Sequence, residues 1–368
     1  MLKIVSMFNL ISFFRILLFC LVHRRKKALI YSHPLNCDGG TTALLQLCRA
    51  LRGQGMSVVS LVRFHGNNEA AFKKLGIPVF CIEDYGALYR VFRYLGGFFA
   101  LTVCNAVSHY QFIELLEKLN RKYIWWIHES VLLNEWITPD MLKAVQASRH
   151  LYCVSPAAQR YMNKYNPQSK ILSLAIDDLY DQYKSHIQHN DKTVFIDVAM
   201  VKRLKGADVL VDAFAALTPD ERQQCEVWFV GKIEPDSAPI VTAGNAIEQI
   251  RFFDALPHDQ TMTMMAKADV LILPSRGDSF GLTVPEALSL DKTVVVSQQS
   301  GVSEMLENGK DAYIFDVNNP AELTEILRRL IGIQNRPGQM NNRQTYERLF
   351  SIQTFNENVA RVLEEEGI

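Results

Sequence analysis

The segment LILPSRGDSFGLTVPEA, residues 271–287, carries the residue types in this chain that are best suited to chemistry. Its apolar start predicts a buried strand that ends near Ser275, followed by a turn with Asp278 and then by a helix that contains Glu286. Free amides at the start of a helix bind anions, and carboxylates accept hydrogen bonds from hydroxyl groups. The segment therefore predicts a site for a phosphate group that is flanked by sugar hydroxyls.

Glu286 also has a purely structural interpretation. The sequence Thr283-Val284-Pro285-Glu286 fits a capping box with proline in the first turn, in which the carboxylate of Glu286 would accept a hydrogen bond from a backbone amide. Taken alone, the segment supports capping and ligand contact equally.

The wider pattern around the two acids resembles a known family. Seven residues separate Asp278 from Glu286, Phe280-Gly281-Leu282 lies between them, and Pro-Ser precedes them. This arrangement resembles the signature of retaining GT-B glycosyltransferases, in particular the large family 4 group that uses nucleotide-sugar donors. The resemblance is strongest from about residue 193 to residue 331. It implies that Glu286 holds the ribose and Asp278 the sugar of the donor, and that further donor contacts lie at Phe280, Gly281, Leu282 and Thr283.

A second match is KGADVLVDAFAAL, residues 205–217, which resembles the Lys-Gly pair and amphipathic helix of that family. The resemblance implies that Lys205 neutralises the donor diphosphate, a charge-assisted contact worth about 1.5–3 kcal/mol. Two positions depart from the family, because Asp278 replaces its usual glutamate and Met200 stands where many members carry an arginine. Arg203 is the expected substitute for that arginine, in preference to Lys202, because a guanidinium can contact a diphosphate with two nitrogens.

The first half of the chain offers two weaker candidates. Residues 38–41, Asp-Gly-Gly-Thr, follow the first predicted strand, and Gly39 and Gly40 resemble the family's loop near donor phosphate and acceptor. An ordinary turn capped by a threonine is the alternative. His128 ends the strand YIWWIHE, where the family often carries a histidine close to the reacting sugar, although a lone histidine is often structural.

The elements that must position these residues alternate between apolar strands and amphipathic helices. Continuous apolar runs are typical of parallel strands that are buried on both faces, and the alternation predicts doubly wound sheets. The predicted strands are 27–32, 57–63, 78–82, 101–106, 123–129, 150–155 and 170–174, then 193–199, 225–231, 251–256, 269–275, 293–298 and 312–317. The predicted helices are 41–54, 109–119, 135–148, 156–165, 206–217, 259–268, 284–290, 302–307, 320–332, 338–349 and 352–366.

The length of 368 residues fits two domains. The expected fold is α/β of the GT-B type, with two Rossmann-like doubly wound domains facing a central cleft and a C-terminal helix crossing back to the first domain. Four segments are predicted: a membrane-associated helix at 1–25, an acceptor-side Rossmann-like domain at 26–185, a nucleotide-sugar donor domain at 193–335, and C-terminal helices at 336–368 that pack toward the N-terminal domain.

Residues 4–22 are apolar enough to suggest a membrane span, but Arg15 would cost about 2.5–3.5 kcal/mol at the centre of one. Polar residues at every third position leave an apolar half, which favours a helix lying in the membrane interface. The basic residues 24–27 follow at once and favour contact with anionic lipid. The segment predicts peripheral membrane contact through residues 4–27 and a cytoplasmic protein at the inner face of the cell membrane, unless the helix packs entirely on its own domain.

The composition of the chain limits which partners, compartments and cofactors are expected. Lys and Arg number 39, as do Asp and Glu, so the net charge is zero and a nucleic-acid partner is not expected. The seven cysteines are scattered, which is typical of a reducing compartment. There is no Asp-x-Asp tripeptide and no His or Cys spacing that suits a metal. We therefore expect no metal and no other cofactor, with the nucleoside-diphosphate sugar acting as a substrate.

Together these features predict a retaining, metal-independent glycosyltransferase. It would move a sugar from a nucleoside-diphosphate donor to a glycan or lipid-linked glycan, in cell-surface polysaccharide or lipopolysaccharide synthesis. The resemblance implies His128, Lys205 and Asp278 as the residues closest to catalysis. Two alternatives stay open: an inactive GT-B relative that binds nucleotide or a partner enzyme at the membrane, and a nucleotide-sugar epimerase.

Overall fold

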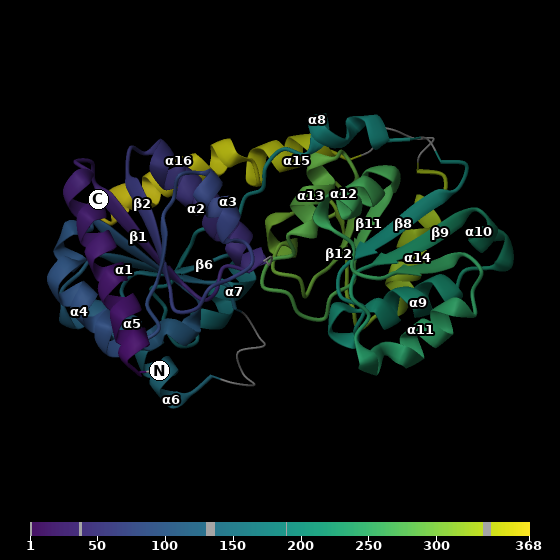
Figure 1. The fold of residues 1–368 in the computed structure, drawn as a ribbon. Coiled ribbons are helices and arrows are strands. Elements are labelled where there is room, and N and C mark those ends of the chain that lie inside the picture. The colour runs from purple at the N-terminus through teal and green to yellow at the C-terminus, as the bar shows by residue number, and fades with distance from the viewer. Residues whose placement is uncertain (1, 37–38, 130–136, 189, 334–339) are drawn as a thin grey trace. The chain divides into compact units, whose positions relative to one another are not determined.

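The computed structural model describes residues 2–36, 39–129, 137–188, 190–333 and 340–368. These residues form two compact units, each built on its own parallel sheet (Figure 1). Unit 1 contains residues 1–175 together with 352–368, and unit 2 contains residues 176–351.

Unit 1 is built on a seven-stranded parallel sheet in the order β3-β2-β1-β4-β5-β6-β7. The strands are β1 (Lys27–Ser32), β2 (Ser57–Val62), β3 (Val79–Cys81), β4 (Leu101–Asn105), β5 (Tyr123–Ile127), β6 (Leu151–Cys153) and β7 (Lys170–Ile171). Its α-helices are α1 (Leu2–Val22), α2 (Gly39–Gly53), α3 (Glu69–Lys74), α4 (Tyr85–Leu95), α5 (Tyr110–Lys118), α6 (Pro139–Ala147), α7 (Pro156–Met162) and α16 (Ile352–Glu365).

The apolar runs explain why this sheet is covered on both faces. Every residue of β5 is buried, including the adjacent tryptophans Trp125 and Trp126, whose side chains leave the strand on opposite faces. Their indole nitrogens donate hydrogen bonds to the carbonyl oxygens of Ala106 and Leu172, at 2.8 and 2.9 Å. Both tryptophans are therefore buried without leaving an indole N–H unpaired.

Unit 2 is built on a six-stranded parallel sheet in the order β10-β9-β8-β11-β12-β13. The strands are β8 (Thr193–Val198), β9 (Cys225–Val230), β10 (Ile250–Phe253), β11 (Val270–Leu273), β12 (Thr293–Ser297) and β13 (Tyr313–Phe315). Its α-helices are α8 (Tyr180–Tyr183), α9 (Ala207–Ala215), α10 (Pro219–Gln223), α11 (Ala238–Asn245), α12 (His258–Lys267), α13 (Thr283–Ser289), α14 (Pro320–Leu330) and α15 (Asn342–Leu349).

The strand order of each sheet contains one point at which the chain reverses its direction of winding. After β1 the chain continues to β2 on one side, and it later returns to β4 on the other side of β1. The same reversal lies between β8 and β11 in unit 2. Loops that leave two such neighbouring strands diverge, so a crevice opens at their carboxyl ends and ligands of doubly wound folds bind there.

The N-terminal helix α1 lies on unit 1 rather than apart from it. Ile16, Phe19 and Cys20 are buried, and α1 contacts α4 and β3. The hydroxyl of Ser12 donates to the carbonyl oxygen of Cys81 at 2.9 Å, and the guanidinium of Arg15 lies 5.3 Å from the centre of the Phe80 ring. Ser12 and Arg15 therefore both find partners on the protein. Within the described part of the chain, no helix combines the length and hydropathy that crossing a membrane requires.

The last two helices belong to different units. Helix α15 packs on α13 in unit 2, and the hydroxyl of Tyr346 donates to the carbonyl oxygen of Ile176 at 3.1 Å. Helix α16 packs on α2 in unit 1, where the rings of Phe355 and Trp126 stack with centroids 6.3 Å apart. The C-terminal helix thus returns to the unit in which the chain began, as the expected fold requires.

Candidate functional site

The switch point of unit 2 brings Lys205 and Asp278 together. Lys205 ends the short 3-10 helix Arg203–Lys205 that follows β8, and Asp278 lies in the loop that follows β11. Because β8 and β11 are neighbours, their loops meet, and Lys205 Nζ lies 2.6 Å from Asp278 Oδ2. About a fifth of each side chain is exposed, at 21% and 18%, so an incoming ligand can reach both groups. The site therefore presents one cation and one anion side by side.

Two glycines allow the backbone to fold this closely. Gly206 has a φ of +79°, and a Cβ atom there would lie 1.8 Å from the carbonyl oxygen of Pro274. Gly281 has a φ of +99°, and its Cβ atom would lie 2.7 Å from a methyl group of Leu273. Side chains rarely adopt either conformation, and both positions are crowded. The two sequence motifs, Lys205-Gly206 and Phe280-Gly281-Leu282, therefore each contain a glycine that the local backbone requires.

Asp197 lies in β8 and is buried with one carboxylate oxygen, Oδ1, that has no hydrogen-bond partner. Burial raises the pKa of Asp197 to about 8, even though the positive charge of Lys205 acts to lower it. A carboxyl group with this pKa is largely protonated at neutral pH. Asp197 therefore does not neutralise Lys205 there, and Asp278 is the carboxylate that pairs with it.

Arg276 orients the loop that carries Lys205, which the sequence analysis did not anticipate. Its guanidinium contacts both carboxylate oxygens of Asp208, at 2.6 and 2.8 Å, and also donates to the carbonyl oxygen of Arg203. The side chain of Arg203 is exposed, as is that of Met200. The structure thus places Arg203 near Lys205 in the same loop but gives its guanidinium no carboxylate partner among the described residues.

The capping box expected at α13 is not formed. Leu282 is the N-cap, no side chain caps the helix, and the Thr283 hydroxyl is buried without a hydrogen-bond partner. The helix begins at Thr283, one residue earlier than a Thr283 cap requires. Glu286 instead has its Oε1 3.3 Å from Nε2 of His258, and this contact raises the pKa of His258. The capping interpretation of Glu286 is therefore wrong, and its carboxylate is directed toward the start of α12.

The residues between Asp278 and Glu286 differ in how far their side chains are buried. Phe280 is buried, and its ring lies edge-to-face with that of Phe350 at 6.0 Å, so its side chain belongs to the core of unit 2. Leu282 and Thr283 are half-buried, whereas Gly281 is buried. Of this group, only Leu282 and Thr283 present side-chain surface at the turn.

The other predicted site residues belong to unit 1. Gly39 and Gly40 are the first residues of α2, and Asp38 before them lies outside the described part of the chain. His128 follows β5 directly and is half-buried, with its ring 4.6 Å from the Trp126 ring in a T-shaped contact. The sequence therefore placed all three at the carboxyl edge of the sheet, where the structure has them.

A polar cluster that the sequence motifs did not bring together lies at the switch point of unit 1. Nδ2 of Asn105, at the end of β4, lies 3.5 Å from the Ser32 hydroxyl and 3.5 Å from Nδ1 of His33, at the end of β1. Glu129 accepts hydrogen bonds from the amides of Val107 and His128, both at 3.1 Å. Burial raises the pKa of Glu129, while these amides and the charge of His33 lower it. These residues lie at or just after the ends of predicted strands, but the strand order that brings them together is not evident from the local sequence.

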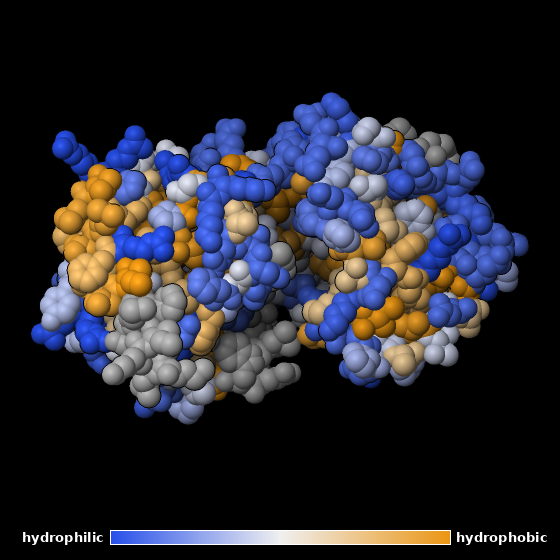
Figure 2. Space-filling view, in the orientation of Figure 1, coloured by the Kyte–Doolittle hydropathy of each residue, from blue (hydrophilic) through white to orange (hydrophobic). Residues whose placement is uncertain are grey.

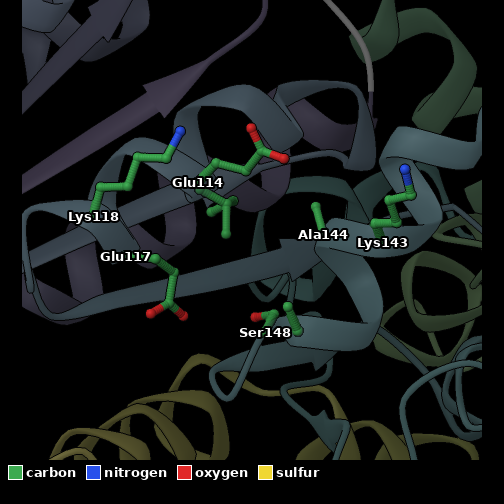
Figure 3. Close-up of a pocket in the computed structure, with 8 residues that line it drawn as sticks. Glu114, Glu117, Lys118, Lys143, Ala144 and Ser148 are labelled. Atoms are coloured by element: carbon green, nitrogen blue, oxygen red, sulfur yellow. The ribbon is translucent and has the colours of Figure 1, made fainter.

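A separate hollow of about 340 Å³ lies between α5 and α6 of unit 1 (Figure 3). Glu117 and Ser148, which line it, both hydrogen-bond to the Tyr123 hydroxyl, at 2.5 and 3.0 Å. Tyr123 begins β5, so this hollow lies at the amino edge of the sheet and contains none of the predicted site residues.

No group of three or more His, Cys, Asp or Glu side chains in the described ranges is arranged to hold a metal ion. Positive charge at the unit 2 site comes from lysine and arginine side chains.

Comparison with known sequences gives the class of protein. Residues 181–346 match the family described as glycosyl transferases group 1. These residues lie within unit 2 and include Lys205, Asp278 and Glu286. This region of the chain therefore matches the family that the resemblance implied.

Two curated relatives illustrate the range of similarity. A D-inositol 3-phosphate glycosyltransferase of Catenulispora acidiphila is 30% identical over 152 residues, which cover 39% of this chain and 36% of that protein. An uncharacterized glycosyltransferase of Methanocaldococcus jannaschii is 24% identical over 271 residues, which cover 70% of this chain and 74% of that protein. The chain thus spans about a third of the first relative and about three quarters of the second.

Solved structures confirm the fold. Anabaena HepE in complex with UDP matches with a TM-score of 0.77 and 17% identity, covering 92% of this chain and 100% of that one. A sucrose-phosphate synthase of Thermosynechococcus elongatus matches with a TM-score of 0.74 and 16% identity, covering 93% and 99%. The chain has the GT-B fold of paired Rossmann-like units that the sequence predicted.

Proposed function

We propose that this protein is a retaining, metal-independent glycosyltransferase that transfers a sugar from a nucleoside diphosphate to an acceptor hydroxyl. The observation that carries this proposal is the Lys205–Asp278 pair at the switch point of unit 2, inside the region that matches the glycosyl transferases group 1 family. Two of the similar structures, both of Anabaena HepE, contain UDP or UDP-glucose, which supports a nucleotide-sugar donor.

The charges at the unit 2 site suit the departure of a diphosphate. As the bond between the anomeric carbon and the phosphate oxygen breaks, negative charge grows on the leaving group, and Lys205 and Arg203 supply the opposite charge. A diphosphate beside Lys205 would share that cation with Asp278, which leaves the Asp278 carboxylate available to sugar hydroxyls. Glu286, which caps no helix here, would hold the ribose hydroxyls.

The acceptor would attack from the same face of the sugar that the diphosphate leaves. A bond forms between the acceptor oxygen and the anomeric carbon, and the acceptor proton passes to an oxygen of the leaving phosphate. The anomeric configuration is then retained without a covalent enzyme intermediate. Gly39 and Gly40 would approach the donor phosphate, and His128 would orient the donor sugar, since each lies at the carboxyl edge of the unit 1 sheet.

We further propose a glycan or lipid-linked glycan acceptor, in cell-surface polysaccharide or lipopolysaccharide synthesis at the inner face of the cell membrane. The lipopolysaccharide outer core galactosyltransferase WaaB shares the fold, with a TM-score of 0.72. Membrane contact through residues 4–27 is supported by α1, whose outer face exposes Leu18, Leu21 and Val22 by 61%, 62% and 65%. Exposed apolar patches of this kind mark interaction surfaces.

Incubation of the purified chain with a panel of nucleoside-diphosphate sugars, in the presence of glycan and lipid-linked glycan acceptors, tests the proposal. Release of nucleoside diphosphate together with a new glycoside, unchanged by a chelator, is the expected result. An isomerised free donor would identify an epimerase instead, and nucleotide binding without any product would identify an inactive relative. Either of these outcomes contradicts the proposed transfer.

A further inference from the structure

A second polar cavity lies at the amino edge of the unit 1 sheet, away from the carboxyl edge that holds the predicted site. Its volume is about 390 Å³, and it lies between the end of α1, the end of α2 and the start of β2. Arg24, Arg25 and Arg52 line it, together with His23 and Ser57. No acidic residue is among its lining residues.

The three arginines carry more positive charge than their local surroundings neutralise. Helices α1 and α2 both end at this cavity, and each carboxyl terminus contributes roughly half a negative charge. Three guanidinium groups therefore leave about two positive charges in excess. Among the described residues, Arg24, Arg25 and Arg52 form no ion pair with a carboxylate. A cluster of this kind fits a phosphate group, which accepts hydrogen bonds from several guanidinium nitrogens.

The cavity is continuous with the apolar outer face of α1. Phe19 and Val22 line the cavity, and Val22 also belongs to the exposed face that includes Phe14, Leu18 and Leu21. Figure 2 shows this face as an orange area over α1. A ligand with a phosphate in the cavity and hydrocarbon chains along α1 would satisfy both surfaces, because burying apolar area and pairing charge are separate favourable terms.

We infer that this cavity binds the phosphate of an anionic lipid headgroup while the outer face of α1 enters the membrane interface. The inference rests on the proposed membrane contact and adds a defined headgroup site. Arg52 is its most informative member, since it comes from α2 and belongs neither to α1 nor to the basic run that follows α1. A basic cluster read from the sequence alone, at residues 24–27, did not include it.

Vesicle flotation of the full chain tests the inference with matched variants. Arg52→Gln removes one charge from the cavity, and Arg149→Gln removes one charge from an exposed position of unit 1 outside it. On vesicles that contain phosphatidylglycerol, Arg52→Gln should weaken binding about fivefold or more, as expected for one basic contact with an anionic surface, and Arg149→Gln should change it less than about twofold. On phosphatidylcholine vesicles the two variants should behave alike.

Other outcomes overturn the inference in distinguishable ways. Equal binding of both variants to phosphatidylglycerol vesicles would show that the cavity takes no headgroup, although the membrane contact would stand. An equal loss for Arg52→Gln on both kinds of vesicle would show that headgroup charge is irrelevant. Inorganic phosphate raising the melting temperature of the native chain but not of Arg52→Gln, with no vesicle difference, would identify free phosphate as the ligand. Absence of native binding to either vesicle would refute the membrane contact as well.

Discussion

At the scale of single residues, the site of unit 2 depends on which carboxylate Lys205 meets. Asp197 and Asp278 are both close to this lysine, but burial keeps Asp197 largely protonated at neutral pH, whereas Asp278 forms a 2.6 Å ion pair. A shorter acid than the family's usual glutamate therefore still reaches Lys205. The departure at Asp278 that the sequence showed leaves this contact in place.

Glu286→Gln separates ligand binding from local stability. Because Glu286 caps no helix, the substitution should leave the melting temperature nearly unchanged, while nucleotide affinity should fall about tenfold through loss of a charge-assisted contact. Calorimetric titration with UDP, GDP and ADP measures the affinity. Unchanged affinity for every nucleotide that binds the native chain would remove Glu286 from the donor site.

The same variant has a spectroscopic consequence at its neighbour. The Glu286 carboxylate raises the pKa of His258, so the pKa of the His258 imidazole should fall in Glu286→Gln. An NMR titration of the His258 ring protons measures this change. An unaltered His258 pKa would mean that the 3.3 Å contact does not persist in solution.

Asp197→Asn should change how stability depends on pH. The pKa of Asp197 is about 8 in the folded chain against 3.8 as the ordinary value, so folding retains a proton that the unfolded chain releases between these values. Stability contributed by Asp197 is therefore present at low pH and lost as pH rises toward about 8. The free energy of unfolding of Asp197→Asn should exceed that of the native chain by a margin that grows from about pH 5 to about pH 8. A margin independent of pH, measured by urea denaturation, would contradict the shifted pKa.

At the scale of elements, all the predicted strands exist in the structure, with ends that differ by a few residues. Continuous burial on both faces makes such strands conspicuous, because nearly every position must be apolar. Five α-helices were missed: α3, α4, α8, α10 and α11. The longest of them is α4, whose sequence YGALYRVFRYL is rich in aromatic residues of modest helix propensity. Its signals were Asp84 before it and the apolar spacing of Ala87, Leu88, Val91 and Leu95, which are all buried.

Asp84→Ala tests whether that cap stabilises α4. The Asp84 carboxylate accepts a hydrogen bond from the Ala87 amide at 2.8 Å, and losing such a cap costs about 1 kcal/mol. The free energy of unfolding should fall by about this amount, whereas Asp84→Asn should retain most of the stability. Equal losses in both variants would show that the charge of Asp84, not its capping oxygen, matters.

The part of the candidate site that could be predicted from the sequence is the part that belongs to recognisable motifs in unit 2. Lys205, Asp278 and Glu286 belong to short patterns with fixed spacing. Lys205 and Asp278 lie in segments that follow neighbouring strands of unit 2, and Glu286 lies in the first turn of α13. His33 and Asn105 have no such pattern around them. They were missed because only the pairing of β1 with β4 brings them together, and strand order is not written in local sequence.

At the scale of the whole molecule, the chain crosses between units twice, at residues 175–176 and 351–352. The second crossing returns α16 to unit 1, where the segment ends in a polar cluster. The side chain of Glu366 is 7% exposed, and its Oε1 accepts a hydrogen bond from the Tyr152 hydroxyl at 2.6 Å. Its other carboxylate oxygen, Oε2, lies 2.5 Å from Nδ1 of His150. The end of the chain is therefore fixed by contacts within unit 1.

Glu366→Ala should destabilise unit 1 without altering unit 2. The Tyr152 hydroxyl would lose its acceptor, at a cost of about 1–3 kcal/mol, whereas Glu364→Ala removes an exposed carboxylate that has no partner of this kind. A lower melting temperature with unchanged nucleotide affinity is expected for Glu366→Ala alone. Equal melting temperatures for the two variants would show that this cluster does not hold α16.

The most direct test of the proposed transfer is the turnover of Lys205→Ala against that of Lys232→Ala, measured as nucleoside diphosphate released per enzyme with the best donor and acceptor. Lys232 is an exposed lysine of unit 2 that pairs with Glu234 at 3.1 Å, so its loss controls for the change in charge. Turnover should fall about a hundredfold or more in Lys205→Ala, because charge on the leaving diphosphate goes unmet, and should stay near native in Lys232→Ala. Near-native transfer by a folded Lys205→Ala would contradict the role assigned to the Lys205–Asp278 pair.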